Sequence, residues 1–228
     1  MLTLLLTMLA GAVACAGTQS TSPGPSAASS PLSWPRTDAE RSGGRPTAVV
    51  LGDSFTVGFG ASGVGYVGDL ADQMGWTAVN AGQSGTGYVN DSGVSGQSAY
   101  GARIQAVVAE APDLVLVQGS TNDVGAASAA AVGRAAQDVY AALHDQLPGV
   151  PVIVLGPLDA PTVDREGVFA VRDALADAAA RAGLPFIDPI ADDWLSSADL
   201  FADGLHPNDK GYAEFADDLA AELHALGF

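Results

Sequence analysis

Apolar runs of strand length alternate with longer stretches of helical periodicity from Pro46 to the end of the chain. The short runs are rich in Val, Leu and Ile without a polar residue at every second position, which is typical of strands covered on both faces. We predict strands at Thr47–Leu51, Thr77–Ala81, Leu114–Gln118, Pro151–Leu155 and Leu184–Ile187.

The segments between these runs carry apolar residues at three- and four-residue spacing, which predicts amphipathic helices. The helices expected are Val64–Met74, Ala99–Glu110, Ala127–Gln146, Arg165–Ala182 and Asn208–Leu226. Strand–helix alternation repeated five times is typical of α/β proteins in which a parallel sheet lies between two helical layers. Reactive groups in such sheets collect beyond the carboxyl ends of the strands, so candidate functional residues are expected there.

The N-terminal segment differs from the rest of the chain in residue composition and pattern. Residues 1–14 form an apolar run that ends in small residues immediately before Cys15. The run is too short to span a bilayer as a stable helix and predicts a signal peptide over residues 1–15. The order resembles a bacterial lipoprotein signal with a lipidated cysteine, although no Lys or Arg precedes it and Ala12 stands where that pattern prefers Leu or Val. An ordinary signal peptide with an incidental cysteine is the alternative.

Both interpretations of this segment predict export, either as a cell-envelope lipoprotein with a membrane tether through Cys15 or as a secreted protein. Residues 16–45 are rich in Ser, Pro, Gly, Ala and Thr and predict a flexible tether. The remaining residues, 46–228, contain no internal repeat and are expected to form one catalytic domain.

The chain is strongly acidic, with a formal net charge of -17 at pH 7 and Lys210 as its one lysine. A surface of this charge repels nucleic acid and anionic lipid headgroups, so neither is expected as a partner. Cys15 is the one cysteine, which excludes an internal disulfide. Three histidines without a cysteine in residues 46–228 are too few ligands for a structural zinc site, so no metal is expected.

The first predicted strand runs into Gly52-Asp53-Ser54, which places Ser54 at a turn from strand to helix. A serine there is exposed at the edge of the sheet, and its backbone N–H lies near a helix N-terminus, where positive potential suits a developing oxyanion. Ser54 is therefore a candidate nucleophile. The alternative is that Ser54 caps the following helix. Asp53 is interpreted as a turn-forming residue.

A candidate base lies near the other end of the chain, in the sequence Asp203-Gly-Leu-His206-Pro-Asn before the last helix. A serine hydroxyl needs a base to take its proton, and histidine is suited to that role near neutral pH. The other ring nitrogen must be held by an acceptor, and Asp203 on the same loop can supply one. The alternative is a surface turn with Pro207 at the first helical position.

Two further segments at strand ends offer hydrogen-bond donors. Asn80-Ala-Gly-Gln-Ser-Gly85-Thr follows the second strand and can present backbone N–H groups, and Gly-Ser-Thr-Asn122-Asp follows the third and offers a side-chain amide. A tetrahedral intermediate of acyl transfer needs several donors aimed at one oxygen. A glycine turn or a helix cap explains either segment alone. Neither explains why all four motifs occur in order at strand ends.

These four blocks together resemble the SGNH hydrolases, also called the GDSL esterase/lipase family, over residues 46–228. The resemblance implies a flavodoxin-like three-layer α/β/α sandwich whose five-stranded parallel sheet has the order 2-1-3-4-5. It also implies a Ser54–His206–Asp203 triad and an oxyanion hole made by Ser54, Gly85 and Asn122. Gly82 is a competing match for Gly85, which is preferred for its distance from Asn80. The first block has Phe55 where the family name has Leu.

The implied activity is that of a serine esterase with no metal or organic cofactor, acting on a small-molecule or polymer-borne ester. Short acyl groups are favoured because no long apolar insertion resembles a lid, and carbohydrate acetyl esters because an exported location favours envelope or environmental polymers. Lysophospholipase, lipase or thioesterase activity is the alternative within the family. A non-catalytic envelope-binding module would be expected to lack the nucleophile or the base. An α/β-hydrolase motif would need Gly at the position of Thr56. A phosphate- or nucleotide-binding flavodoxin-like protein would need a phosphate-cradling loop after the first strand, where Asp53 would repel the anion.

The remaining candidates are interpreted as structural. His144 lies on a predicted helix and His224 near the chain terminus, and both are expected to be solvated. The sequence Asp192-Asp193-Trp194 precedes the catalytic loop, and Trp194 is expected to belong to the core.

Overall fold

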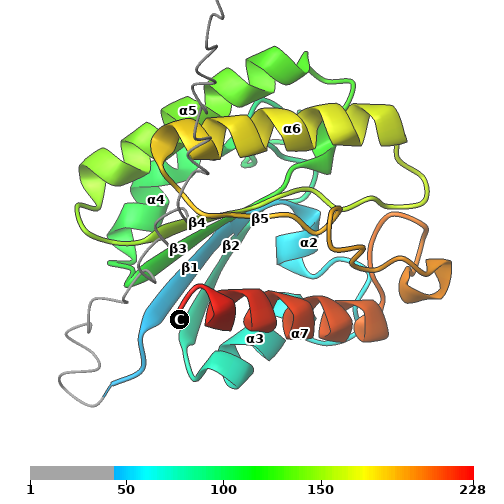
Figure 1. Ribbon diagram of the computed structural model, residues 1–228, viewed down its shortest axis with the longest axis horizontal. Helices are drawn as coiled ribbons and strands as arrows, with labels where there is room; N and C mark the ends of the chain where they lie inside the picture. The colour runs from blue at the N-terminus through cyan, green and yellow to red at the C-terminus, as the bar shows by residue number, and fades with distance from the viewer. Residues whose placement is uncertain (1–43) are drawn as a thin grey trace, which may run out of the picture. The chain divides into compact units, whose positions relative to one another are not determined.

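Five parallel strands form a single sheet in the computed structural model, which describes residues 44–228. The strand order is β2-β1-β3-β4-β5 (Figure 1). The strands are β1 (Thr47–Gly52), β2 (Thr77–Gly82), β3 (Leu114–Gln118), β4 (Val152–Leu155) and β5 (Phe186–Ile187). This confirms the predicted α/β fold and the strand order that the resemblance implied. The predicted signal segment, Cys15 and the tether up to residue 43 lie outside the described residues.

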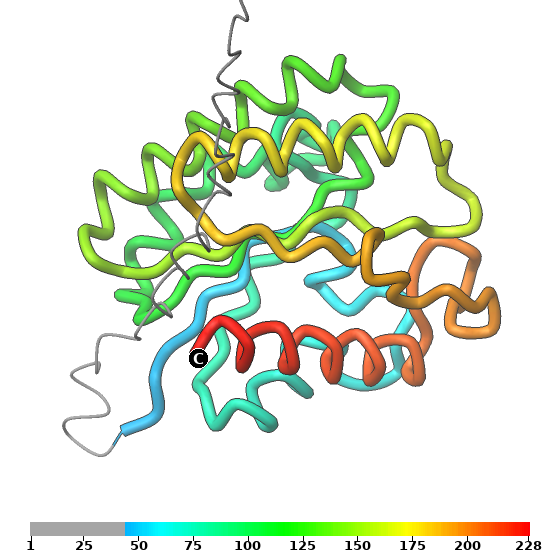
Figure 2. The backbone as a smooth tube through the Cα atoms, in the orientation of Figure 1, coloured from blue at the N-terminus to red at the C-terminus, as the bar shows by residue number. Residues whose placement is uncertain are grey.

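Helices cover both faces of the sheet (Figure 1). The helices on one face are α3 (Gly65–Met74) and α7 (Asp209–Ala225), and those on the other are α4 (Ile104–Ala109), α5 (Ala129–Gln146) and α6 (Arg165–Ala182). Short helical turns lie in the connections, namely α2 (Ser54–Val57), η1 (Tyr100–Arg103), η2 (Thr121–Asp123) and η3 (Ala198–Leu200). The backbone trace in Figure 2 shows α2 and the loop before α7 at the same edge of the sheet, beyond the carboxyl ends of the strands.

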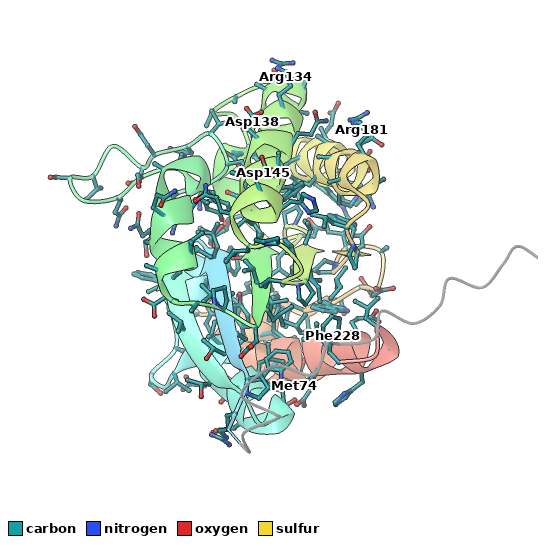
Figure 3. The ribbon with its side chains drawn as sticks, turned by 90° about the vertical axis from the view of Figure 1, so that its left-hand side faces the viewer. Met74, Arg134, Asp138, Asp145, Arg181 and Phe228 are labelled. Atoms are coloured by element: carbon teal, nitrogen blue, oxygen red, sulfur yellow. The ribbon has the colours of Figure 1, made fainter. Side chains whose placement is uncertain are left out.

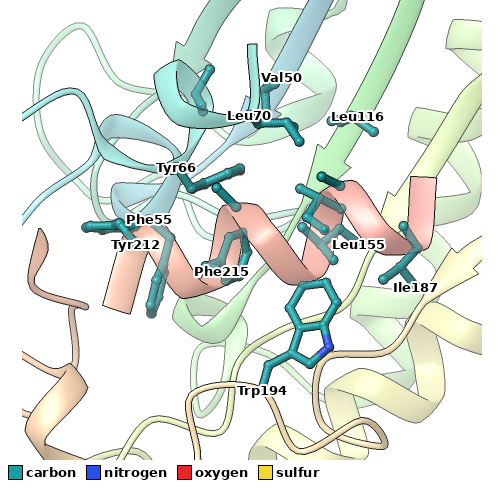
Figure 4. Packing of buried hydrophobic residues seen from close by; sticks show 14 of the residues in the cluster. Val50, Phe55, Tyr66, Leu70, Leu116, Leu155, Ile187, Trp194, Tyr212 and Phe215 are labelled. Atoms are coloured by element: carbon teal, nitrogen blue, oxygen red, sulfur yellow. The ribbon is translucent and has the colours of Figure 1, made fainter. Parts of the chain in front are cut away.

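The side chains on the two faces of the sheet pack into two separate hydrophobic cores. Along β1, Ala48 and Val50 pack toward α3 and α7, whereas Val49 and Leu51 pack toward the opposite helices. This alternation follows from the period-two geometry of a strand, and it explains why the strands read as continuous apolar runs. In the first core, aromatic side chains from α3 and α7 meet the sheet, as Figure 4 shows for Tyr66 and Phe215. Their ring centroids lie 4.4 Å apart.

Local sequence signals set the helix boundaries. Ser128 caps α5 by accepting from Ala131 N–H, and Asp164 caps α6 by accepting from Gly167 N–H at 3.1 Å. Gly183 ends α6 with φ at 67°, a conformation that favours glycine. Charged side chains lie on the outer faces of these two helices, as Figure 3 shows for Arg134 on α5 and Arg181 on α6.

The predicted elements match the observed ones with two differences of substance. The helix expected over Ala99–Glu110 divides into η1 and α4, because Arg103 at the junction turns inward to bond the sheet. The strand expected over Leu184–Ile187 is limited to Phe186–Ile187, since Pro185 has no N–H to donate to a neighbouring strand. Among the described residues, no helix is both long and apolar enough to cross a membrane.

Candidate active site

Ser54 is the first residue of α2 and follows the last residue of β1 after a single intervening position. Asp53, and not Ser54, caps this helix, because its carboxylate accepts from Phe55 N–H at 2.9 Å. The serine hydroxyl is therefore not used as a cap. A Cβ at position 52 would lie 2.0 Å from Thr56 Oγ1, so the turn requires Gly52.

Ser54, His206 and Asp203 form one continuous chain of hydrogen bonds. Ser54 Oγ lies 2.9 Å from His206 Nε2, and His206 Nδ1 lies 2.8 Å from Asp203 Oδ2. A carboxylate facing Nδ1 holds the proton on that nitrogen, which leaves Nε2 as the acceptor for the serine hydroxyl. The structure thus brings together three side chains from the two ends of the domain, as the sequence predicted.

The loop between η3 and α7 orients the histidine. Ala202 N–H donates to His206 C=O at 2.8 Å, while Asp203 Oδ1 accepts from the N–H groups of Leu205 and His206 at 2.9 and 2.7 Å. The hydrogen bond from His206 N–H, together with that from its ring, lowers the pKa of Asp203 to about 2. Asp203, whose side chain is 46% exposed, is therefore ionised at neutral pH.

The backbone donors differ between the two candidate glycines. Gly82 N–H donates to Asn80 Oδ1 at 3.0 Å, so this group already has an acceptor. In residues 44–228, by contrast, Gly85 N–H and Ser54 N–H have no hydrogen-bond acceptor. Gly85 has φ at 75°, in the left-handed region, which turns the chain at this point. The geometry is compatible with Gly85, and not Gly82, as an oxyanion donor.

The Asn122 side chain lies beside the same turn. Asn122 Nδ2 donates to Thr86 C=O at 3.0 Å and to Asp53 Oδ2 at 3.3 Å. Asn122 is thus fixed both to the residue after Gly85 and to the residue before Ser54. The sequence did not indicate that the amide would have protein acceptors. The 3.3 Å hydrogen bond to Asp53 is the longer of the two, so it yields more readily to another oxygen.

Asp123 holds the loop that follows Gly85, a role that sequence reasoning missed. This buried carboxylate accepts from three consecutive backbone N–H groups, those of Tyr88, Val89 and Asn90, at 2.8, 3.0 and 3.0 Å. Burial raises the pKa of Asp123, and these N–H groups oppose the rise. Because Asp123 is adjacent to Asn122 in sequence, it fixes the loop that follows Gly85 relative to Asn122.

Two more buried charged residues lie beneath the site. The Arg103 guanidinium donates to Gly52 C=O at 3.0 Å and to Ala81 C=O at 2.7 Å, which joins the ends of β1 and β2. Asp53 is fully buried, and desolvation raises its pKa to about 7. An arginine within an otherwise apolar helical stretch and an aspartate next to the nucleophile were the available sequence signals for these roles.

The remaining candidates match their structural interpretation. Trp194 is 8% exposed, and its ring packs edge-on against Phe215 with centroids 5.4 Å apart. His144 and His224 are exposed. Across residues 44–228, no group of three or more His, Cys, Asp or Glu side chains could hold a metal ion.

Comparisons with known proteins agree with this site. Residues 50–214 match the model of the GDSL-like lipase/acylhydrolase family. A GDSL lipase of Mycobacterium tuberculosis is 32% identical over 186 residues, which covers 75% of this chain and 78% of the relative. Two solved structures, each 17% identical, have the same fold. A carbohydrate acetylesterase from Sinorhizobium meliloti matches with a TM-score of 0.68 over 80% of this chain and 100% of the acetylesterase. An aryl esterase of M. smegmatis matches with a TM-score of 0.66 over 79% of this chain and 99% of the aryl esterase.

The family model and the mycobacterial relative each cover most of the catalytic domain that the sequence predicted, and they confirm the resemblance read from its four motifs. The chain therefore belongs to the GDSL-like lipase/acylhydrolase family, whose members are hydrolases that act on ester bonds.

Proposed function

We propose that this chain hydrolyses carboxylic esters of short acyl groups, with Ser54 as nucleophile, His206 as general base and acid, and Asp203 as the group that orients His206. The observation that carries the proposal is the unbroken hydrogen-bond chain from Ser54 Oγ through the imidazole to the Asp203 carboxylate. Serine is a weak nucleophile without such a base, and this arrangement supplies one.

His206 Nε2 takes the hydroxyl proton while Ser54 Oγ attacks the ester carbonyl carbon. The carbonyl oxygen becomes an oxyanion, which accepts from the N–H groups of Ser54 and Gly85 and from Asn122 Nδ2. The imidazolium then gives its proton to the oxygen of the leaving alcohol, and the acyl group remains on Ser54. A water molecule deprotonated by His206 attacks the acyl-enzyme, and the acid is released as Ser54 regains its proton.

The Asn122 amide contributes by replacing its long hydrogen bond to Asp53 with one to the oxyanion. Its other hydrogen bond, to Thr86 C=O, keeps the amide in place as this exchange occurs. Because its hydrogen bond to Thr86 stays in place, the amide needs little reorganisation when negative charge develops.

Short acyl groups are proposed because the sequence contains no long apolar insertion of the kind that covers a lipid chain. Carbohydrate acetyl esters are one source of such substrates, and the acetylesterase of Sinorhizobium meliloti shares the fold. The name of the Mycobacterium tuberculosis relative instead favours longer acyl chains, so acyl length is the variable to measure.

The test is hydrolysis of p-nitrophenyl esters from acetyl to palmitoyl. Ser54→Ala is expected to abolish turnover with the fold retained in circular dichroism. Ser128→Ala serves as the matched control, since it removes a hydroxyl that caps α5 and touches no residue of the triad. Turnover retained by Ser54→Ala overturns the mechanism, and a wild-type preference for palmitoyl over acetyl esters overturns the assignment of acyl length.

We also propose that the protein is exported and that Cys15 carries the lipid of a bacterial lipoprotein. The support is the order of apolar residues, small residues and cysteine at the N-terminus. Mass spectrometry of the mature N-terminus tests this, because a diacylated Cys15 at the first position is expected and an unmodified N-terminus at any other residue contradicts it.

A further inference from the structure

The exposed large apolar side chains of the described residues are concentrated in two loops. They are Val57, Phe59, Val64, Val89 and Val94, and their exposed fractions lie between 39% and 66%. The first three follow β1 and the other two follow β2, so all of them belong to connections that leave the carboxyl ends of neighbouring strands. Exposed apolar groups confined to the connections of the catalytic edge point to contact with a substrate that has an apolar part.

Among these five side chains Phe59 is the aromatic one, and its ring contacts His206. The centroids of the Phe59 and His206 rings lie 4.5 Å apart with an interplanar angle of 53°. Phe59 is nevertheless 52% exposed as a residue, so its side chain contacts the imidazole and still faces solvent.

The backbone of Phe59 is anchored on both sides. Its N–H donates to Ser54 C=O at 3.0 Å, and its C=O accepts from Tyr212 Oη at 2.8 Å. At the next position, a Cβ would lie 2.8 Å from Pro207 O and 3.0 Å from His206 Cβ, so the chain needs Gly60 to pass this close to the histidine. A half-exposed aromatic ring held in this way gains only part of the free energy of full burial, so a ligand that covers it gains the rest.

The position of Phe59 indicates which half of an ester it meets. In the proposed mechanism His206 Nε2 hands its proton to the leaving oxygen, which must therefore lie within hydrogen-bond distance of the imidazole. The carbonyl oxygen points the other way, toward Gly85 and Asn122. Since Phe59 lies against the imidazole, the group that reaches its exposed part is the alcohol.

Resting on the proposed function, we infer that Phe59 is a specificity-determining residue that binds the alcohol half of the ester and favours an uncharged ring alcohol with a flat apolar face. Such a face packs on the half-exposed phenyl ring and covers it. An anionic alcohol is disfavoured, because Asp203 is ionised and partly exposed beside the same histidine and the chain carries a net charge of -17.

The experiment compares benzyl acetate, cyclohexylmethyl acetate and ethyl acetate, which share the acyl group and have alcohols of similar acidity. For Phe59→Ala, the ratio of kcat/KM for benzyl over ethyl acetate is expected to fall about 2- to 12-fold, the range that one aromatic contact contributes. The ratio for ethyl butyrate over ethyl acetate is expected to keep its wild-type value, since it reports the acyl half. The cyclohexylmethyl ester shows whether the contact needs a flat aromatic ring or only an apolar ring of similar size.

Phe169→Ala is the matched control, because it makes the same substitution at a partly exposed phenylalanine of α6, whose ring lies 5.3 and 4.9 Å from the guanidinium groups of Arg165 and Arg172. Phe59→Leu keeps an apolar side chain and is expected to show a smaller fall than Phe59→Ala, which guards against misfolding of the alanine variant. An unchanged benzyl-to-ethyl ratio in both Phe59 variants overturns the inference, as does a change confined to the butyrate-to-acetate ratio. A wild-type protein that hydrolyses none of these esters overturns the proposed function and this inference together.

Discussion

Replacing the buried Asp53 by asparagine should change how the stability of the protein depends on pH. Desolvation raises the pKa of this carboxyl from its ordinary value of 3.8 to about 7. Between those two pH values the folded protein keeps a proton on Asp53, whereas the unfolded chain has lost it. The folded state binds more protons in this window, so the free energy of unfolding falls as the pH rises through it.

The size of this effect follows from the pKa of the buried group. A tenfold change in proton affinity corresponds to about 1.4 kcal/mol. The rise from 3.8 to about 7 therefore corresponds to roughly 4 kcal/mol of stability, present in full below pH 4 and lost by about pH 7. Burial of Asp123 acts in the same direction, so the Asp53→Asn variant should retain a smaller slope and not become independent of pH.

Urea unfolding followed by tryptophan fluorescence at pH 5 and pH 8 measures the difference. The wild type should lose more stability than Asp53→Asn between these values, and the variant should be the more stable protein at pH 8. Asp138→Asn on the exposed face of α5 is the control, because it removes the same formal charge without a buried site. Equal pH dependence in the wild type and Asp53→Asn would refute the reasoning.

Two further predictions concern turnover. Asn122→Ala should lower kcat about 10²- to 10³-fold, as expected for one oxyanion donor, with little change in KM for p-nitrophenyl acetate; a loss under tenfold would argue against that role. Asp203→Asn should lower kcat on the order of 10⁴-fold by allowing the wrong imidazole tautomer. Because the pKa of Asp203 is about 2, ionisation of Asp203 should not limit the wild-type pH–rate profile above pH 4; an acid limb that Asp203→Asn abolishes would contradict this.

The fold was predictable because its signals are local. Strands such as Leu114–Gln118 consist of five consecutive buried residues, and helices such as Arg165–Ala182 carry their own cap and terminal glycine. Each signal lies within a few residues of the element that it specifies. The hydrogen-bonded set of Ser54, His206 and Asp203 was predictable for a related reason, since Asp203 and His206 lie on one loop and the strand end before Ser54 fixes its side of the sheet.

The contacts around the triad were not predictable in the same way. Arg103 meets Gly52 across 51 positions of sequence, and Asn122 meets Asp53 across 69. Nothing in the segments that hold these residues specifies the partner, because the partner is brought near only when the sheet has assembled. The role of Phe59 was equally hidden, since only the folded loop brings its ring against His206.

The buried charges at the ends of the strands are costly for the fold. Desolvation is the largest cause of the raised pKa of Asp53 and Asp123 and of the lowered pKa of Arg103, so each loses solvation that its hydrogen bonds only partly replace. Yet these are the residues that fix the ends of β1 and β2 and the loop beside Asn122. Their polar contacts hold the proposed oxyanion donors in place before substrate binds, which is what stabilising an oxyanion requires. Replacing one of these charged residues by a neutral one should raise stability while lowering kcat, provided that its former partner is not left beside a like charge. Substitutions in the apolar core beneath α7 should lower stability and leave the kcat of the folded protein largely unchanged, because there packing alone is at stake.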